Sequence, residues 1–293
     1  MPPPTTATSG ATPDIRDGVA IHHDATARPP LTAGERWTRS ALEELRARRF
    51  TPAAWARFIG ASAARSLEDL RRRPDLARQG AAAVIGGGVP WLAGRRWGAL
   101  IWWSAVGAML LTHIGMVEGP AGERRSGIGA ANAVSLARAW LVPAIAGARD
   151  RRVVASLAAV AFVSDALDGP LARARGEETR LGAQMDHAVD VALTMVVADT
   201  ARRRGWIPTW AAAAVAARYA VPVVAVTVHY FARAEAPPRG RFLPARGAGV
   251  LVATGLVGSA FGRRRVCEGL VVAGVGWGSL LAVASTVRSL REA

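Results

Sequence analysis

Residues 165–190 read DALDGPLARARGEETRLGAQMDHAVD, and apolar sequence flanks this stretch on both sides. Four aspartates stand in it, at Asp165, Asp168, Asp186 and Asp190. A carboxylate inside an apolar helix costs roughly several kcal/mol unless another group compensates its charge. Four such carboxylates so close in sequence indicate a bound cation.

The spacing of the aspartates predicts how they meet. Asp165 and Asp168 share one helix face at i,i+3, and Asp186 and Asp190 share another at i,i+4. The polar run 175–180 is a good turn between two antiparallel helices, so all four carboxylates converge roughly 13–18 Å from it, at 1.5 Å of rise per residue. Two glycines, Gly169 and Gly182, lie slightly closer to the turn and, without a Cβ, allow a ligand or the opposite backbone to approach.

The chemistry of this quartet narrows the ion. The ligands are carboxylate oxygens with no His or Cys among them, which favours Mg²⁺ or Mn²⁺, typically with phosphate as a further ligand.

The same stretch resembles the pattern of the CDP-alcohol phosphotransferase (CDP-alcohol phosphatidyltransferase) family, D-x2-D-G-x2-A-R-x8-G-x3-D-x3-D. All eight fixed positions are filled at the correct spacing, a coincidence that chance does not readily produce. They are Asp165, Asp168, Gly169, Ala172, Arg173, Gly182, Asp186 and Asp190. The helix pattern that follows extends the resemblance over roughly residues 127–290.

This resemblance implies an enzyme that transfers a substituted phosphate from a CDP-alcohol, most often CDP-diacylglycerol, to an acceptor hydroxyl and releases CMP, as in phospholipid biosynthesis. By the same resemblance Asp165, Asp168 and Asp186 hold metal, and Asp190 is the general base and a further metal contact. Gly169, Ala172 and Gly182 make room for cytidine, and Arg173 faces phosphate. The family also implies a homodimer.

Other interpretations of the aspartates stay open. They fit the cation pathway of a membrane transporter, or a buried ion-pair network with Arg138, Arg173 or Arg218. A catalytically inactive family member is a further alternative, although the intact quartet argues against it. An interaction protein that works through its N-terminal helices is the last.

Composition agrees with a membrane protein. Hydrophobic residues make up 51% of the 293-residue chain, and the formal net charge is +15. All 37 basic residues are arginine, a bias typical of a GC-rich genome, so the charge by itself does not indicate nucleic acid. No aromatic-basic nucleic-acid motif is present, and anionic lipid headgroups are the simpler partner. The single cysteine, Cys267, excludes an internal disulfide.

The apolar pattern predicts an all-α integral membrane bundle with six core transmembrane helices in a domain over 127–290. The predicted spans are 131–148, 151–174, 181–201, 207–231, 247–262 and 266–288. Upstream we expect a disordered tail over 1–30, an amphipathic helical region over 31–80 and an additional membrane segment over 81–120. Within the amphipathic region over 31–80 two helices are predicted, at 35–49 and 52–73. The second would lie on an anionic membrane surface or pack on the core.

The arginines give a weak orientation. Eleven fall on the side of the aspartate turn and nine on the other, which favours an active site that faces the cytoplasm from the cell membrane. A lone span at 97–117 would place the Arg-rich N-terminus outside, against this rule. A re-entrant hairpin over 81–117 would resolve the conflict.

Several further residues are candidates for the site. Asn132, Ser135 and Arg138 form an N-x2-S-x2-R opening of the first core span, which resembles that of many family members and points to nucleotide or aspartate contacts. Arg218 lies mid-span and needs an anionic partner, either an acceptor phosphate or one of the aspartates. Arg239 and Arg241 lie in a basic loop on the aspartate side and could bind an acceptor phosphate or lipid headgroups. A phosphorylated alcohol acceptor is therefore favoured.

Overall fold

In the computed structural model the described residues are 31–119, 122–234, 245–262 and 264–291. The tail predicted over 1–30 lies outside them. Thr32 onward belongs to one compact unit. The side chains of 167–173, 245–246, 264, 283 and 285–291 are not described.

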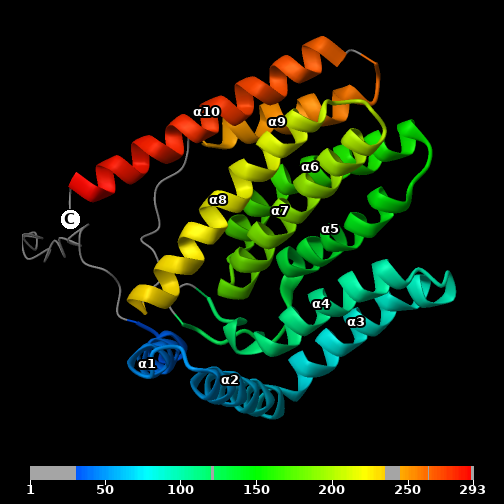
Figure 1. Cartoon of the computed structure of the whole chain (residues 1–293). Coiled ribbons are helices and arrows are strands. Elements are labelled where there is room, and N and C mark those ends of the chain that lie inside the picture. Colours follow the sequence, from blue (N-terminus) through cyan, green and yellow to red (C-terminus); the bar gives the residue numbers. More distant parts are fainter. Residues whose placement is uncertain (1–30, 120–121, 235–244, 263, 292–293) are drawn as a thin grey trace, which may run out of the picture. The chain divides into compact units, whose positions relative to one another are not determined.

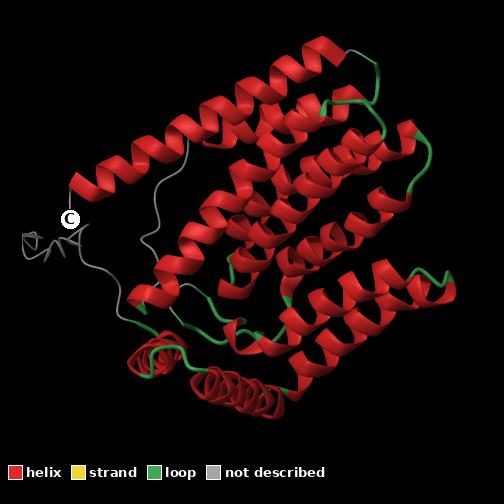
Figure 2. Ribbon diagram, in the orientation of Figure 1, coloured by secondary structure: helices red, strands yellow, loops and turns green. Residues whose placement is uncertain are grey.

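In the described part of the chain six long helices follow residue 128, at nearly the positions that the apolar pattern predicts (Figures 1 and 2). Glycines in the left-handed region, Gly176 and Gly205, lie in the turns that follow α6 and α7. Thr179 caps the start of α7, because its hydroxyl accepts a hydrogen bond from the amide of Gly182. The helices are α5 (Gly129–Gly147), α6 (Arg151–Arg175), α7 (Arg180–Arg203), α8 (Thr209–Arg233), α9 (Ala245–Ser259) and α10 (Arg264–Arg291).

Helix α5 packs against both α6 and α7, and α9 pairs closely with α10. The second contact depends on glycine: a Cβ on Gly255 would lie 2.8 Å from the carbonyl oxygen of Cys267, and one on Gly274 would lie 2.7 Å from that of Ala248. Close approach of helix backbones through small residues is typical of helix pairs in membranes.

Among the described residues two helices are long and apolar enough to cross a membrane, namely Thr209–Arg233 and residues Arg265–Ala282 of α10. Two shorter apolar helices lie at Trp97–Thr112 and Gly247–Ser259. The other predicted spans are helices as well, but charged residues such as Arg138, Asp165 and Asp186 lower their mean hydropathy. That all six cross a membrane stays a prediction.

The outward face of α8 is apolar. Val221 is 66% exposed, and Val224 and Val228 are each 60% exposed. Three valines a turn apart on one open helix face form a surface that lipid would cover and that water would not favour.

The N-terminal region contains the two amphipathic helices that its pattern predicts, α1 (Ala33–Ala47) and α2 (Pro52–Arg72). A capping box between Thr32 and Glu35 begins α1, and the Thr51 hydroxyl with Pro52 begins α2. Leu42 and Leu45 bury the inner face of α1.

Helices α3 (Pro74–Ala93) and α4 (Trp97–Thr112) form an antiparallel hairpin, which a short 3-10 helix, η1 (Ile114–Met116), follows (Figure 1). Helix α3 begins at Pro74 and crosses residue 80, where the sequence analysis places a boundary, and Gly80 itself is buried within the helix. The glycines at 86–88 do not end it: Trp103 packs on Gly87 and Gly88, and its indole donates to the Val84 carbonyl.

This hairpin runs alongside α5. Near its open end the Gln79 side chain accepts a hydrogen bond from the amide of Ile128, 3.1 Å away, just before α5 begins. At its turn Arg96 lies against Gly147, where α5 ends. The chain therefore folds as a hairpin here, and α3 begins on the same side as the aspartate turn. That this hairpin is re-entrant in a membrane stays a prediction.

Candidate active site

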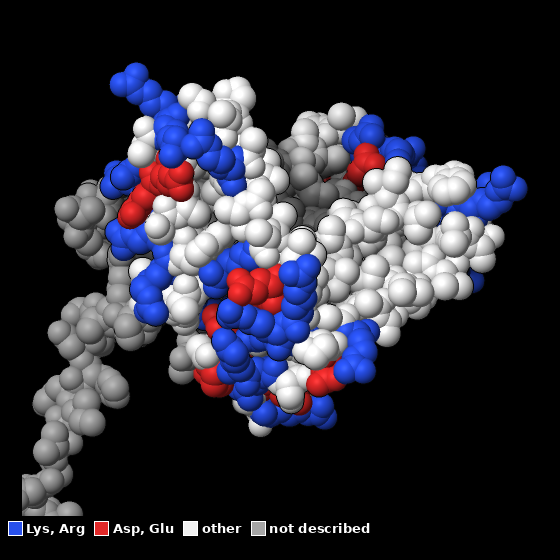
Figure 3. Space-filling model, turned by 90° about the horizontal axis from the view of Figure 1, so that it is seen from below, with Lys and Arg blue, Asp and Glu red and all other residues white. Residues whose placement is uncertain are grey.

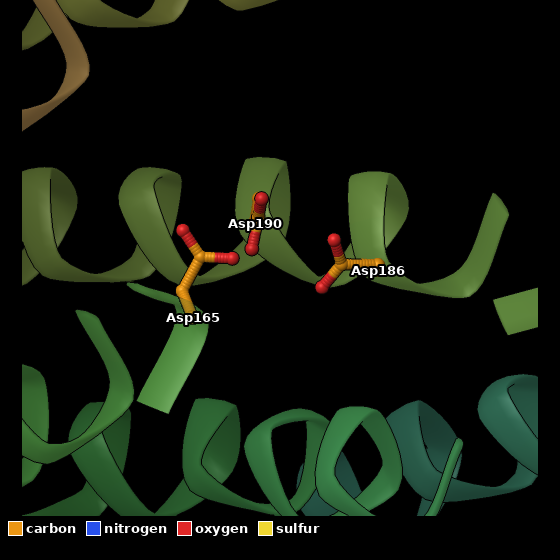
Figure 4. Close-up of side chains that lie close together, drawn as sticks. All are labelled: Asp165, Asp186 and Asp190. Atoms are coloured by element: carbon orange, nitrogen blue, oxygen red, sulfur yellow. The ribbon is translucent and has the colours of Figure 1, made fainter. Parts of the chain in front are cut away.

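Three carboxylates converge between α6 and α7. Asp165 comes from α6, and Asp186 and Asp190 come from α7, one turn apart (Figure 4). One carboxylate oxygen from each lies within 4.8 Å of the other two. All three side chains are partly exposed, so a ligand can reach them. This confirms the convergence that the spacing predicts for three of the four aspartates.

A buried arginine faces this triad. Arg138 of α5 is only 2% exposed, and its guanidinium forms ion pairs with Asp165 at 3.1 Å and, more closely, with Asp186 and Asp190. The ion-pair network with Arg138, one of the alternatives drawn from the sequence, is therefore present. Among the described side chains one guanidinium faces three carboxylates, so acidic groups outnumber basic ones in this part of the network.

The donor set fits a divalent cation. Three hard carboxylate oxygens from two rigid helices lie close enough to share one ion, and oxygen ligands of this kind suit Mg²⁺ or Mn²⁺. The two positive charges of such an ion would also offset the excess of carboxylates among the described side chains of the cluster. The arrangement therefore both permits a cation and favours one electrostatically.

Asn132 ties α5 to the start of α7. Its side-chain amide donates to the Thr179 hydroxyl at 3.1 Å and closely to the Ile128 carbonyl. Gly182 lies beneath it: a Cβ there would come within 3.0 Å of both Asn132 Oδ1 and Thr179 Oγ1. Ser135 is buried and donates to the Ala131 carbonyl of its own helix. The structure thus gives Gly182 a packing reason, which the pattern alone does not supply.

Three contacts that the sequence analysis missed hold the turn between α6 and α7. The Glu177 carboxylate accepts a hydrogen bond from the amide of Ala130 at the start of α5, 3.0 Å away. Arg125 donates to the Gly176 carbonyl at 2.6 Å. These residues lie in the variable part of the family pattern or upstream of it, so spacing gave no sign of them. The one sequence signal for the contact between Glu177 and Ala130 is that acidic side chains are favourable near the N-terminus of a helix.

The third contact joins the turn to the N-terminal helices. Arg180 begins α7, its amide donates to the Glu118 carbonyl at 3.0 Å, and its guanidinium pairs with Glu35 of α1. Burial raises the pKa of Glu35, but hydrogen bonds from Thr32 and Arg180 outweigh this and hold the pKa below its ordinary value of 4.5.

Arg218 does not contact the three aspartates whose side chains are described. Its guanidinium donates to the Gly274 carbonyl of α10 at 3.3 Å and lies over the Tyr219 ring. Gly278 makes the space for it, because a Cβ there would overlap the guanidinium. Among the described side chains Arg218 forms no ion pair, so the aspartate partner that the sequence analysis offered is not observed.

The remaining candidates cannot be placed. Asp168, Gly169, Ala172 and Arg173 lie on helix α6, but their side chains are not among those described, and Arg239 and Arg241 lie outside the described residues.

Residues 129–283, just over half of the chain, match the sequence profile of the family described as CDP-alcohol phosphatidyltransferase. The chain belongs to this family. No curated protein and no solved structure matches it significantly. The matched residues begin at the first residue of α5 and end within α10, so they include all three converging aspartates and Arg138.

Membership implies transfer of a phosphate-containing group from a CDP-alcohol to an acceptor, and the family normally uses a divalent metal. The apolar helices agree with a membrane protein. Helices α1 to α4 lie outside the matched residues and are an addition to the family's domain.

Proposed function

We propose that this protein transfers a substituted phosphate from CDP-diacylglycerol to the hydroxyl of an acceptor alcohol and releases CMP, as a step of phospholipid biosynthesis. The observation that carries the proposal is the convergence of Asp165, Asp186 and Asp190 within the complete family pattern. A scaffold would need neither partly exposed carboxylates nor the excess of carboxylates among the described side chains.

The aspartates divide the work. Asp165, Asp168 and Asp186 would hold Mg²⁺ or Mn²⁺, which would neutralise the diphosphate and stabilise the charge on the departing CMP. Asp190 would accept the proton of the acceptor hydroxyl, with which it must come within hydrogen-bond distance. Because Asp190 is partly exposed, an acceptor can approach it.

The neighbouring residues would shape the nucleotide site. Gly169 and Ala172 would leave room for cytidine, and Arg173 would pair with phosphate. Gly182 would act by letting Asn132 and Thr179 fix the distance between α5 and α7. Arg138 would hold the carboxylates in place and screen their mutual repulsion.

An apolar groove beside the site supports a lipid-linked donor. It has a volume of about 280 Å³, and Trp102 and Met109 of α4 line it opposite Met185, Val189 and Ala192 of α7. Met185 and Val189 directly precede Asp186 and Asp190, so the groove runs along the helix that carries the reacting groups. An acyl chain would bury apolar surface there, whereas a small water-soluble CDP-alcohol would gain nothing from it.

The paired helices α3 and α4 support an active site that faces the cytoplasm. Because the hairpin returns the chain to its starting side, the arginines of α1 and α2 lie on the same side as the aspartate turn. The bias of eleven arginines against nine becomes larger in the same direction, as the positive-inside rule requires for a cytoplasmic face. A CDP-linked substrate from the cytosol requires that orientation as well.

The acceptor is proposed to be a phosphorylated alcohol, which Arg239 and Arg241 would bind through its phosphate. Arg218 would contribute only if its guanidinium left the Gly274 carbonyl. The protein is further proposed to act as a homodimer, as the family resemblance implies.

The test is CMP release from CDP-diacylglycerol by the purified protein with Mg²⁺ or Mn²⁺, across phosphorylated and uncharged acceptor alcohols. We expect acceptor-dependent CMP that Asp190→Asn abolishes. The matched control is Asp199→Asn, since Asp199 lies on the same helix but pairs with Arg202 and Arg203 at its far end. No CMP with any acceptor, from folded protein that binds metal, would contradict the proposal and leave a cation transporter or an inactive family member.

A further inference from the structure

Helix α2 turns an open face away from the protein. Ala53, Arg57, Gly60, Ala64, Leu67 and Arg71 follow one another at spacings of four and three residues, which places them on one stripe, and all six are exposed. Leu67 is 54% exposed and the nearby Ile59 is 61% exposed. Small and apolar side chains therefore fill the middle of this face, and an arginine stands toward each end.

The two arginines form no ion pair with the described part of the chain. Among the described residues neither Arg57 nor Arg71 forms an ion pair, whereas Arg72 on the adjoining side pairs with Glu68 at 2.5 Å. Residues 33–72, which span α1, α2 and the turn between them, carry nine arginines and five acidic residues, a net charge of +4. Figure 3 shows the face of the molecule that includes these helices, with basic side chains gathered beside a surface that lacks charge. Such a face complements an anionic surface.

Helices α1 and α2 together form an N-terminal hairpin, and the position of this hairpin in the fold indicates what that anionic surface is. Trp55 and Phe58 of α2 pack on Phe231 at the end of α8, with ring centroids 5.3 and 6.5 Å apart. Arg46 of α1 donates to the Ala232 carbonyl at 3.2 Å. The hairpin thus meets α8 where its exposed valine face ends, which is the depth at which aromatic residues gather at a membrane surface.

We propose that the outer face of α2 binds the anionic phospholipid headgroups of the bilayer that surrounds α8. Ile59 and Leu67 enter the boundary between headgroups and acyl chains, and Arg57 and Arg71 pair with headgroup phosphates. This inference depends on the membrane location of α8 and is independent of the transferase activity.

The N-terminal hairpin of α1 and α2 also contacts the residue that follows the turn between α6 and α7. Glu35 at the start of α1 pairs with Arg180, the first residue of α7, whose guanidinium also lies 3.4 Å from the Thr32 hydroxyl. A lipid surface that holds α1 and α2 therefore steadies the start of α7, the helix that carries Asp186 and Asp190. Anionic lipid is expected to order this turn as well as α2.

The experiment is hydrogen–deuterium exchange of the full-length protein in nanodiscs of phosphatidylcholine alone and of phosphatidylcholine with 30% phosphatidylglycerol. We expect the amides of α2 to exchange several-fold more slowly in the anionic discs. Arg57→Gln/Arg71→Gln should remove most of that difference, because each arginine near an anionic surface contributes on the order of fivefold to binding. The control Arg95→Gln/Arg152→Gln removes the same charge from exposed positions at the other end of the bundle and should keep it.

Unchanged exchange of α5 and of the part of α7 beyond Asp190 in both variants shows that they fold. Equal exchange of α2 in the two kinds of disc would overturn the proposal, as would protection that persists in the double variant. Protection that needs a cellular membrane extract, and that lipid alone does not give, would overturn it in favour of a protein partner. Exchange reads the hairpin directly, so a protein that releases no CMP would contradict the proposed transferase without changing this result.

Discussion

Asn132 lies directly over Gly182, so that a Cβ on this glycine would come closer to the asparagine Oδ1 than 3.0 Å, a separation that real Cβ atoms essentially never show. The same Cβ would lie 2.9 Å from the Thr179 hydroxyl oxygen. Asn132 belongs to α5 and Thr179 caps α7, so the missing Cβ sets how closely the two helices approach one turn before Asp186. A fixed glycine of the family pattern is thus a packing requirement where α5 meets the start of α7.

Gly182→Ala is therefore expected to push α5 and α7 apart and to lower the rate of CMP release by on the order of a hundredfold, the effect of about 1 Å of misplacement. The measurement is the steady-state rate with saturating CDP-diacylglycerol and metal. Gly249→Ala in α9 is the matched control, because a Cβ there would meet nothing within 4 Å. Equal activity in the two variants would refute the packing role.

Replacement of one carboxylate should weaken metal binding. Asp165→Asn or Asp186→Asn removes one of three converging charged ligands. We expect a loss of Mn²⁺ affinity of at least about tenfold, since even outer partners of metal ligands are worth 10- to 100-fold. The measurement is Mn²⁺ titration followed by electron paramagnetic resonance, with Asp199→Asn as control. Undiminished binding in both Asp165→Asn and Asp186→Asn would place the metal elsewhere.

Arg138 distinguishes a metal site from a closed ion-pair network. Arg138→Gln leaves three carboxylates without their guanidinium, and removing one member of a buried ion pair typically costs about 3–5 kcal/mol. The metal-free variant should therefore unfold at a lower temperature than the wild type. A divalent cation should restore more of the lost stability than it adds to the wild type, because the variant cluster is the more negative. The same metal-induced shift in both proteins would argue that no ion binds at the triad.

The sequence predicts the part of this structure that depends on spacing. Two carboxylate pairs at i,i+3 and i,i+4 on either side of a short polar turn can converge in one way only, and three of the four are seen to do so. The core helices were predictable because apolar runs between arginine- and glycine-rich turns leave little freedom in a helical bundle.

Residues of the site that depend on tertiary packing were less predictable. Arg218 appears in sequence as a buried cation that requires an anion, yet a backbone carbonyl at Gly274 and the space over Gly278 accommodate it. Neither feature can be read from α8 alone. Glu177 and Arg180 stand at variable positions of the pattern. Their roles depend on the tertiary fold, which brings α5 next to Glu177 and α1 next to Arg180.

Glu177 should prove to be a structural residue of the turn. Glu177→Ala removes the carboxylate that accepts a hydrogen bond from the Ala130 amide at the N-terminus of α5. The negative charge of this carboxylate also interacts favourably with the helix dipole there. We expect a loss of about 1 kcal/mol in stability, typical of a lost helix cap. The neighbouring Glu178 is exposed, so Glu178→Ala should change stability by less than about 0.5 kcal/mol. Thermal unfolding of the two variants in the same detergent gives the comparison, and equal losses would contradict the capping role.

The attachment of α1 to the start of α7, through Glu35 and Arg180, should depend on pH. Burial acts to raise the pKa of Glu35, but its hydrogen bonds from Thr32 and Arg180 prevail and lower the pKa below 4.5. A carboxyl group with a lowered pKa stabilises the folded state above its unfolded value, and that contribution is lost as the pH falls through the lower, folded value. The protection of α1 from hydrogen exchange, corrected for intrinsic rates, should therefore fall several-fold between pH 6 and pH 3.5.

At every pH, α1 of the Glu35→Gln variant should exchange as α1 of the acidified wild type does. Glu43→Gln, which removes an exposed carboxylate from the same helix, should keep the pH dependence. A wild-type profile that stays flat over this range would show that the contact between Glu35 and Arg180 does not hold α1 on the turn.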